Sequence, residues 1–127
     1  MTESNIPEDL KKYLIPAFKR KPKSITAIKV KQLSSYTDTL IIIECNSRRQ
    51  VNSFAQYLII ELKKKSIKPI GMEGIKDCEW ALLDYGDAVI HIFESQAKSF
   101  FDIEGLWADA PRVDLLELEE IYGQKDK

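Results

Sequence analysis

The stretch that most constrains the fold is WALLDYGDAVIHIF, residues 80–93. Apolar side chains recur on both sides of a central Asp-Tyr-Gly-Asp, which predicts two strands joined by a tight turn in which Gly86 adopts a positive φ. Side chains alternate between the faces of a sheet, so His91 and Phe93 share one face. The hairpin also carries two aspartates and the only histidine of the chain. This leaves two alternatives, a catalytic site and a surface that binds another molecule.

Three further segments have the pattern of strands. Residues 25–31 alternate isoleucine and valine with lysine, which predicts a half-buried strand. The run TLIIIEC at 39–45 predicts a fully buried strand, and residues 68–74 predict a short edge segment limited by proline and glycine. We therefore expect an α/β fold, a small single domain with a mixed sheet of about five strands and flanking helices. We expect this domain to span residues 1–112, followed by an acidic tail at 113–127 that is either a short helix or without fixed structure.

The helical segments differ in how clearly they are marked. In the clearest, Asn46 or Ser47 can cap the start, and one apolar stripe recurs at three- and four-residue spacing: Val51, Phe54, Leu58 and Leu62. An earlier helix is predicted to begin at Pro7 and to end or kink early at Pro16. Residues 95–107 also have helical spacing.

The composition is that of an ordinary soluble domain. The 127 residues are 44% apolar and 31% charged, and the longest apolar runs are far too short to span a bilayer. The N-terminus lacks the apolar core of a secretion signal and the arginines of a transit peptide. Cys45 and Cys78 are isolated, which favours two free thiols in a reducing cytoplasm over a zinc site. We expect a cytoplasmic protein without membrane contact or cofactor.

The net charge of −1 conceals an asymmetry along the chain. Residues 1–77 hold 15 Lys and Arg against 8 Asp and Glu, whereas residues 78–127 hold 4 against 12. The lysines of the first half are scattered and are not interleaved with stacking aromatics, so solvated faces explain them better than nucleic acid does. The acidic half would repel nucleic acid and attract a basic protein surface.

A catalytic or metal site is poorly supported. Asp87 and His91 point to the same side of an ideal strand, but their Cα atoms would lie roughly 13 Å apart, too far for one metal ion. Aspartate is also common in turns, because its carboxylate accepts hydrogen bonds from nearby amides; this explains Asp84 and Asp87. Cys45 ends an apolar strand, which favours a buried and inert thiol. The glycines form no phosphate-binding loop. We predict no catalytic residues and no metal ligands.

Aromatic and acidic residues are concentrated near the end of the chain. A 28-residue stretch holds five aromatics and three carboxylates of interest: Trp80, Phe93, Phe100, Phe101 and Trp107, with Asp84, Asp102 and Glu104. Core packing explains some of these rings. An exposed aromatic patch surrounded by acids is the alternative, and this is the composition of a protein-binding site. Composition alone does not choose between the two.

Four segments in order carry a family resemblance: SSYTDTLIIIECNSRRQV (34–51), PIGMEG (69–74), the hairpin (80–93) and FFDIEGLWADAPR (100–112). Their succession of Gly-x-Glu-Gly, Trp, Asp-x-Gly-Asp, Ile-His-Ile and Leu-Trp resembles the ribosomal silencing factor family, RsfS/Iojap. The resemblance implies a nucleotidyltransferase-like core without the catalytic carboxylates of that superfamily. It further implies a translational repressor that binds the large ribosomal subunit through its protein fourteen and sterically blocks joining of the small subunit.

The resemblance also implies which residues bind the partner: Trp80, Phe101, Asp102, Glu104, Leu106 and Trp107. On this basis we expect the rings of Trp80, Phe101 and Trp107 to project into water between carboxylates that pair with Lys and Arg of the ribosomal protein. No sequence-specific contact with nucleic acid is implied, and the free protein could form a homodimer.

This sequence departs from the family pattern in four places. Phe101 replaces a common tyrosine, and the arginine common near Ser99 is missing, which leaves Lys98 as the nearest cation. Gly105 should weaken the last helical turn, and Pro16 should shorten the first helix. The alternative function is a nucleotidyltransferase-like enzyme that holds magnesium with Asp38, Asp84 or Asp87.

Overall fold

The five strands form one mixed sheet, as the sequence predicts, and the structure shows their order to be β1-β2-β5-β4-β3. Strands β2 and β5 are parallel and the other neighbouring pairs are antiparallel. The computed structural model describes residues 6–33, 36–74, 77 and 79–122. The elements are α1 (Glu8–Lys19), β1 (Ser24–Lys29), β2 (Thr39–Cys45), α2 (Arg48–Lys63), β3 (Gly71–Glu73), β4 (Trp80–Asp84), β5 (Ala88–Glu94), α3 (Ser95–Phe101), α4 (Ile103–Leu106) and α5 (Leu116–Tyr122).

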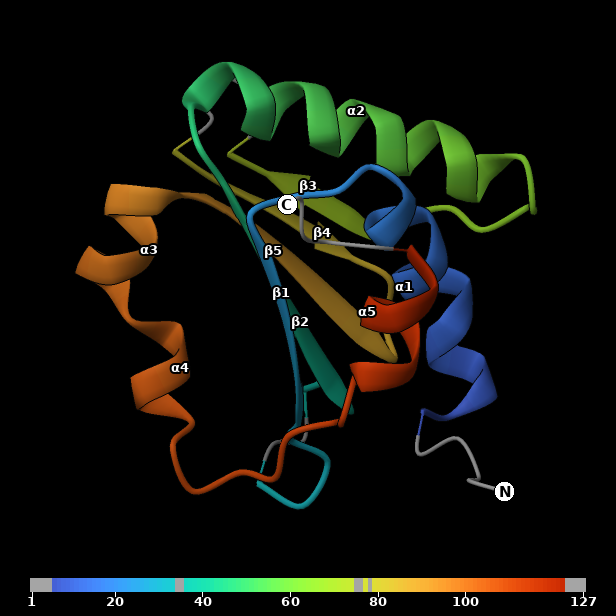
Figure 1. The fold of residues 1–127 in the computed structure, drawn as a ribbon, viewed down its shortest axis with the longest axis vertical. Coiled ribbons are helices and arrows are strands. Elements are labelled where there is room, and N and C mark those ends of the chain that lie inside the picture. The colour runs from blue at the N-terminus through green and yellow to red at the C-terminus, as the bar shows by residue number, and fades with distance from the viewer. Residues whose placement is uncertain (1–5, 34–35, 75–76, 78, 123–127) are drawn as a thin grey trace.

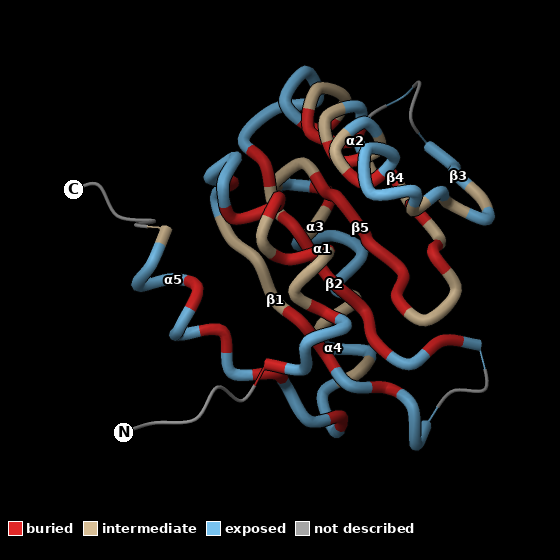
Figure 2. The backbone as a smooth tube through the Cα atoms, turned by 90° about the vertical axis from the view of Figure 1, so that its right-hand side faces the viewer, coloured by how far each residue is buried: buried red, intermediate tan, exposed pale blue. Residues whose placement is uncertain are grey.

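The helices cover the two faces of the sheet unequally. Helices α1, α2 and α5 lie on one side, and the short helices α3 and α4 lie on the other (Figure 1). The central strands β2 and β5 are buried along most of their length (Figure 2). Because two short helices cover less area than three helices, the face on the α3–α4 side keeps partly exposed side chains at its margin, among them Trp80 and Leu82.

The longest helix is confirmed as predicted. Ser47 caps α2, since its hydroxyl accepts a hydrogen bond from the amide of Gln50 at 3.2 Å. The apolar stripe is buried against the sheet at all four expected positions: Val51, Phe54, Leu58 and Leu62. The predicted half-buried and fully buried strands are likewise present as β1 and β2.

The prediction that Pro16 ends the first helix early is wrong, whereas the alternative of a kink at Pro16 stays a prediction. Helix α1 continues to Lys19, and Pro16 lies in its last turns, where the missing amide removes only one helical hydrogen bond. Burial of Ala17 and Phe18 beyond the proline favours continuation. The hydroxyl of Tyr57 in α2 also donates to the Pro16 carbonyl at 3.0 Å, which ties the two helices together.

The C-terminal part of the described chain packs on the same core. Within the segment 113–127, for which we expected a short helix or no fixed structure, the described residues Leu116–Tyr122 form α5, which lies beside α1 (Figure 1). Val113, Leu115 and Leu118 are buried there. A backbone hydrogen bond from Val113 to the Ala27 carbonyl, at 2.9 Å, also joins this segment to β1. Among the described residues, no helix is both long and apolar enough to cross a membrane.

Candidate protein-binding surface

Both aspartates of the hairpin accept hydrogen bonds within the protein, and the carboxylate of Asp84 holds the turn. Gly86 has a φ of +90°, and its amide donates to Asp84 Oδ1 at 2.8 Å. The other carboxylate oxygen of Asp84 accepts from the Tyr36 hydroxyl at 2.7 Å, and Asp87 Oδ1 accepts from the Tyr13 hydroxyl at 2.7 Å. The interpretation of Asp84 as a turn residue is therefore confirmed. In the part of the chain that the structure describes, no three His, Cys, Asp or Glu side chains gather as metal ligands.

Cys45 has the environment of a structural thiol. It is buried at the end of β2, and burial, the largest cause, raises the pKa of its thiol to about 12. At neutral pH the sulfur therefore stays protonated and unreactive. This confirms the expectation of a buried, inert cysteine.

Trp80 lies at the margin of the sheet among other rings. Its indole stacks on Phe93, with the ring centroids 4.9 Å apart, and packs against Phe101 of α3 at 4.7 Å. The indole nitrogen donates to Nδ1 of His91 at 2.9 Å. These contacts leave Trp80 half-buried, so that only part of its ring system reaches the solvent.

The expectation that both indoles project into water is wrong. Trp80 and Trp107 are half-buried, because both pack against the apolar cluster between the sheet and helices α3 and α4. The Phe101 side chain is 42% exposed, so its ring reaches the solvent as expected. The most exposed apolar side chains here are Phe100, at 81%, and Leu106, at 75%.

Phe100 lies outside the six residues that the family resemblance assigns to the partner, yet it belongs to the same surface. The ring of Phe100 meets the ring of Phe101 edge-on, with the centroids 5.1 Å apart, and Phe101 in turn contacts Trp80. Phe100, Phe101 and Trp80 therefore form one aromatic surface. An open groove of about 600 Å³ runs alongside, lined by Ser47, Arg48, Glu79, Glu94, Gln96, Ala97, Phe100 and Phe101. Two consecutive phenylalanines in a seven-residue helix were a signal for this surface, because only one of them can face the sheet.

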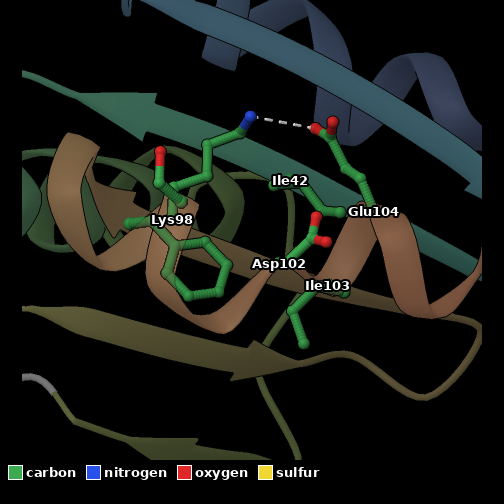
Figure 3. Close-up of a pocket in the computed structure, with 7 residues that line it drawn as sticks. Ile42, Lys98, Asp102, Ile103 and Glu104 are labelled. Atoms are coloured by element: carbon green, nitrogen blue, oxygen red, sulfur yellow. Dashed lines mark ion pairs between the residues drawn. The ribbon is translucent and has the colours of Figure 1, made fainter.

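The two acids near the aromatic surface, Glu104 and Asp102, differ in their ion pairs. Glu104 is paired within the protein: its carboxylate lies 3.2 Å from Lys98 Nζ and 3.8 Å from Arg112 Nη2. This pair of Lys98 and Glu104 belongs to the wall of a cavity of about 340 Å³ (Figure 3), which is lined by Ile42, Phe93, Lys98, Ser99, Asp102, Ile103 and Glu104. Asp102, by contrast, is exposed and makes no ion pair among the described residues.

Asp102 also interrupts the helix that residues 95–107 were predicted to form. Its backbone is left-handed, with φ +48°, and divides the segment into α3 and α4. Its side chain caps α4 by accepting from the amide of Gly105 at 3.0 Å. A Cβ atom at Gly105 would lie 2.2 Å from Asp102 Oδ2, so glycine leaves the space that this cap needs.

Comparison with known proteins agrees with this architecture. Residues 3–127 match the family model described as "Ribosomal silencing factor during starvation". The ribosomal silencing factor RsfS of Haemophilus influenzae is 38% identical over 88 residues, which cover 69% of this chain and 86% of that protein. RsfS of Halalkalibacterium halodurans is 32% identical over 96 residues, covering 76% of this chain and 82% of the relative.

Solved structures show the same fold. A crystal structure of a protein from Chromobacterium violaceum superposes with a TM-score of 0.74 at 31% identity, and covers 80% of this chain and 85% of that one. A structure from Bacillus halodurans also has a TM-score of 0.74, at 29% identity, and covers 85% of this chain and 98% of that one. The chain therefore belongs to the RsfS family of ribosomal silencing factors.

Proposed function

We propose that this protein represses translation in the cytoplasm by binding the large ribosomal subunit through its protein fourteen and by sterically blocking the small subunit. The observation that carries the proposal is the aromatic surface of Phe100, Phe101 and Trp80, with exposed Asp102 beside it, on a ribosomal silencing factor. Exposed rings that a small domain could have buried are typical of a surface that a partner covers.

The charges beside the aromatic surface favour a basic protein as the partner. Asp102 follows Phe101 directly and is exposed, so its carboxylate is available to Lys or Arg of another chain. Glu104 is already paired with Lys98 and Arg112, and would contribute chiefly by holding α4 in place. Ribosomal proteins are usually basic, and an acidic surface would also slow any direct contact with RNA.

Such a repressor needs no reaction chemistry. A bound domain excludes whatever must occupy the same space, so the rings and carboxylates only have to provide affinity and orientation. This role agrees with the engagement of Asp84 and Asp87 in hydrogen bonds to tyrosine hydroxyls. Leu106 of α4, three quarters exposed, would extend the apolar contact beyond the aromatic surface.

Replacing Phe101 tests this proposal. We expect Phe101→Ala to weaken binding to isolated protein fourteen by about 30- to 1000-fold, the loss of 2–4 kcal/mol typical of an aromatic hot spot. Titration calorimetry measures this. The control is Ile60→Ala, which removes a similarly exposed side chain from α2 on the opposite side of the sheet. Equal affinities for a folded Phe101→Ala variant and the control would contradict the assignment of this surface.

A further inference from the structure

The indole of Trp80 donates its hydrogen bond inside the protein. Because an indole nitrogen can only donate, Nδ1 of His91, 2.9 Å away, must carry a lone pair, and the imidazole must be neutral. His91 is 7% exposed, and burial lowers its pKa to about 4. At neutral pH this histidine is therefore a constant hydrogen-bond acceptor for Trp80.

The sheet register explains how the two side chains meet. Trp80 is opposite Phe93, and Leu82 is opposite His91, so Trp80 and His91 are diagonal neighbours on one face. The two rings lie 5.7 Å apart, while the rings of His91 and Phe93 are stacked within 10° of parallel. The indole thus packs against the rings of His91 and Phe93, and its hydrogen bond to His91 fixes which edge of the indole faces inward.

We propose that His91 is a positioning residue for partner binding, which holds the Trp80 N–H inward so that the indole presents only carbon atoms to the partner. This inference rests on the proposed function, because it requires Trp80 to lie in the interface. In the free protein Trp80 is half-buried, so without His91 its N–H can turn to water. In the complex the partner would exclude that water and bury an unpaired donor, which is costly. Loss of the acceptor should therefore weaken binding more than folding.

Two substitutions at His91 separate the hydrogen bond from simple packing. His91→Phe fills the space but removes the acceptor, whereas His91→Gln keeps an acceptor oxygen. We expect His91→Phe to weaken binding to protein fourteen roughly tenfold, and His91→Gln to retain most of the affinity. Unfolding in urea gives the stability of each variant. Comparing the two variants shows whether the loss of affinity for protein fourteen depends on the missing acceptor or on a loss of stability.

Nuclear magnetic resonance of ¹⁵N-labelled protein reports the hydrogen bond directly. The indole N–H signal of Trp80 is identified as the one that persists in Trp107→Phe, a variant used only for assignment. We expect this signal to shift in His91→Phe towards the position of a solvent-exposed indole, and to shift less in His91→Gln. An unchanged signal in His91→Phe would overturn the proposal.

The outcomes distinguish this inference from the proposed function. If the wild-type protein binds protein fourteen and His91→Phe binds equally well, His91 has no positioning role and only the inference fails. Losses of affinity that match the losses of stability in both variants would also reduce His91 to a packing residue. If the wild-type protein does not bind at all, the proposed function fails and the inference fails with it, even where the indole signal shows the hydrogen bond.

Discussion

Asp102 and Glu104 are two residues apart, yet their carboxylates have different surroundings. Glu104 lies between Lys98 and Arg112 and is only 21% exposed, so its charge is neutralised within the chain. Asp102 is exposed and accepts a hydrogen bond from Gly105. Of the two acids that the family resemblance assigns to the partner, Asp102 is therefore the better candidate for a new ion pair, because Glu104 would first have to leave two cations.

The protonation of His91 predicts how stability depends on pH. In the unfolded chain this imidazole titrates near 6.5, whereas in the native protein burial lowers its pKa to about 4. Between these values the unfolded chain binds a proton that the native protein does not, so stability falls as the pH falls from 6.5 towards 4. The full loss, reached below pH 4, is roughly 3–4 kcal/mol, because a difference of one in pKa is worth about 1.4 kcal/mol.

Urea unfolding at pH 7, 6 and 5 measures this effect. His91→Gln has no imidazole to protonate and should lose less stability than the wild-type protein over this range, in which most carboxylates remain ionised. Parallel stability curves for the two proteins would show that His91 does not titrate as its burial implies.

At the scale of elements, the junction between α3 and α4 depends on Asp102. Its left-handed backbone directs the chain out of α3, and its carboxylate caps α4. Asp102→Ala loses the cap and also places a residue with a less favourable left-handed conformation there, so we expect it to destabilise the protein by about 1 kcal/mol. Asp102→Asn keeps an acceptor and tolerates this conformation, and should be nearly as stable as the wild-type protein.

The variants Asp102→Ala and Asp102→Asn also separate two possible roles of Asp102 in partner binding, its helix cap and its negative charge. With the fold retained, Asp102→Asn should slow association with a basic partner and make it less sensitive to salt, because only the charge is lost. Thermal unfolding and stopped-flow association measure the two effects. A salt dependence identical to that of the wild-type protein would argue against an ion pair at Asp102.

At the scale of the whole molecule, the C-terminal helix contributes to the main core. Leu118 of α5 is buried among the residues that cover the α1–α2 side of the sheet. We expect Leu118→Ala to destabilise the protein by about 2–3 kcal/mol, the usual cost of removing a buried leucine. Ile121→Ala, in the same helix but exposed, should change stability by no more than about 0.5 kcal/mol. Equal urea midpoints for the two variants would show that α5 does not support the core.

The fold was predictable from sequence where local patterns determine the structure. The run at 39–45 and the apolar stripe that begins at Val51 correspond closely to β2 and α2. A short continuous apolar run reflects a strand that is buried on both faces, and helical periodicity reflects a helix that buries one face. Helix α1 passes through Pro16 because of burial beyond the proline, and this depends on contacts with distant parts of the chain. Local propensity does not contain such information.

The candidate site was predictable only in part for a similar reason. Alternation places Trp80 on a given face of the sheet, but it does not say how far α3 and α4 cover that face. The break at Asp102 and the pairing of Lys98 with Glu104 across it both depend on a left-handed residue that helical spacing does not reveal. The exposure of Phe100 did have a signal in the sequence, because only one of two consecutive phenylalanines in a short helix can face the sheet.

Sedimentation with separated ribosomal subunits shows whether this protein keeps the subunits apart. The purified protein is mixed with large subunits, small subunits are added, and the mixture is resolved on a sucrose gradient. We expect the protein to sediment with the large subunit and the peak of whole ribosomes to decrease as more protein is added. Protein that remains at the top of the gradient, with an undiminished peak of whole ribosomes, would refute repression by subunit blocking.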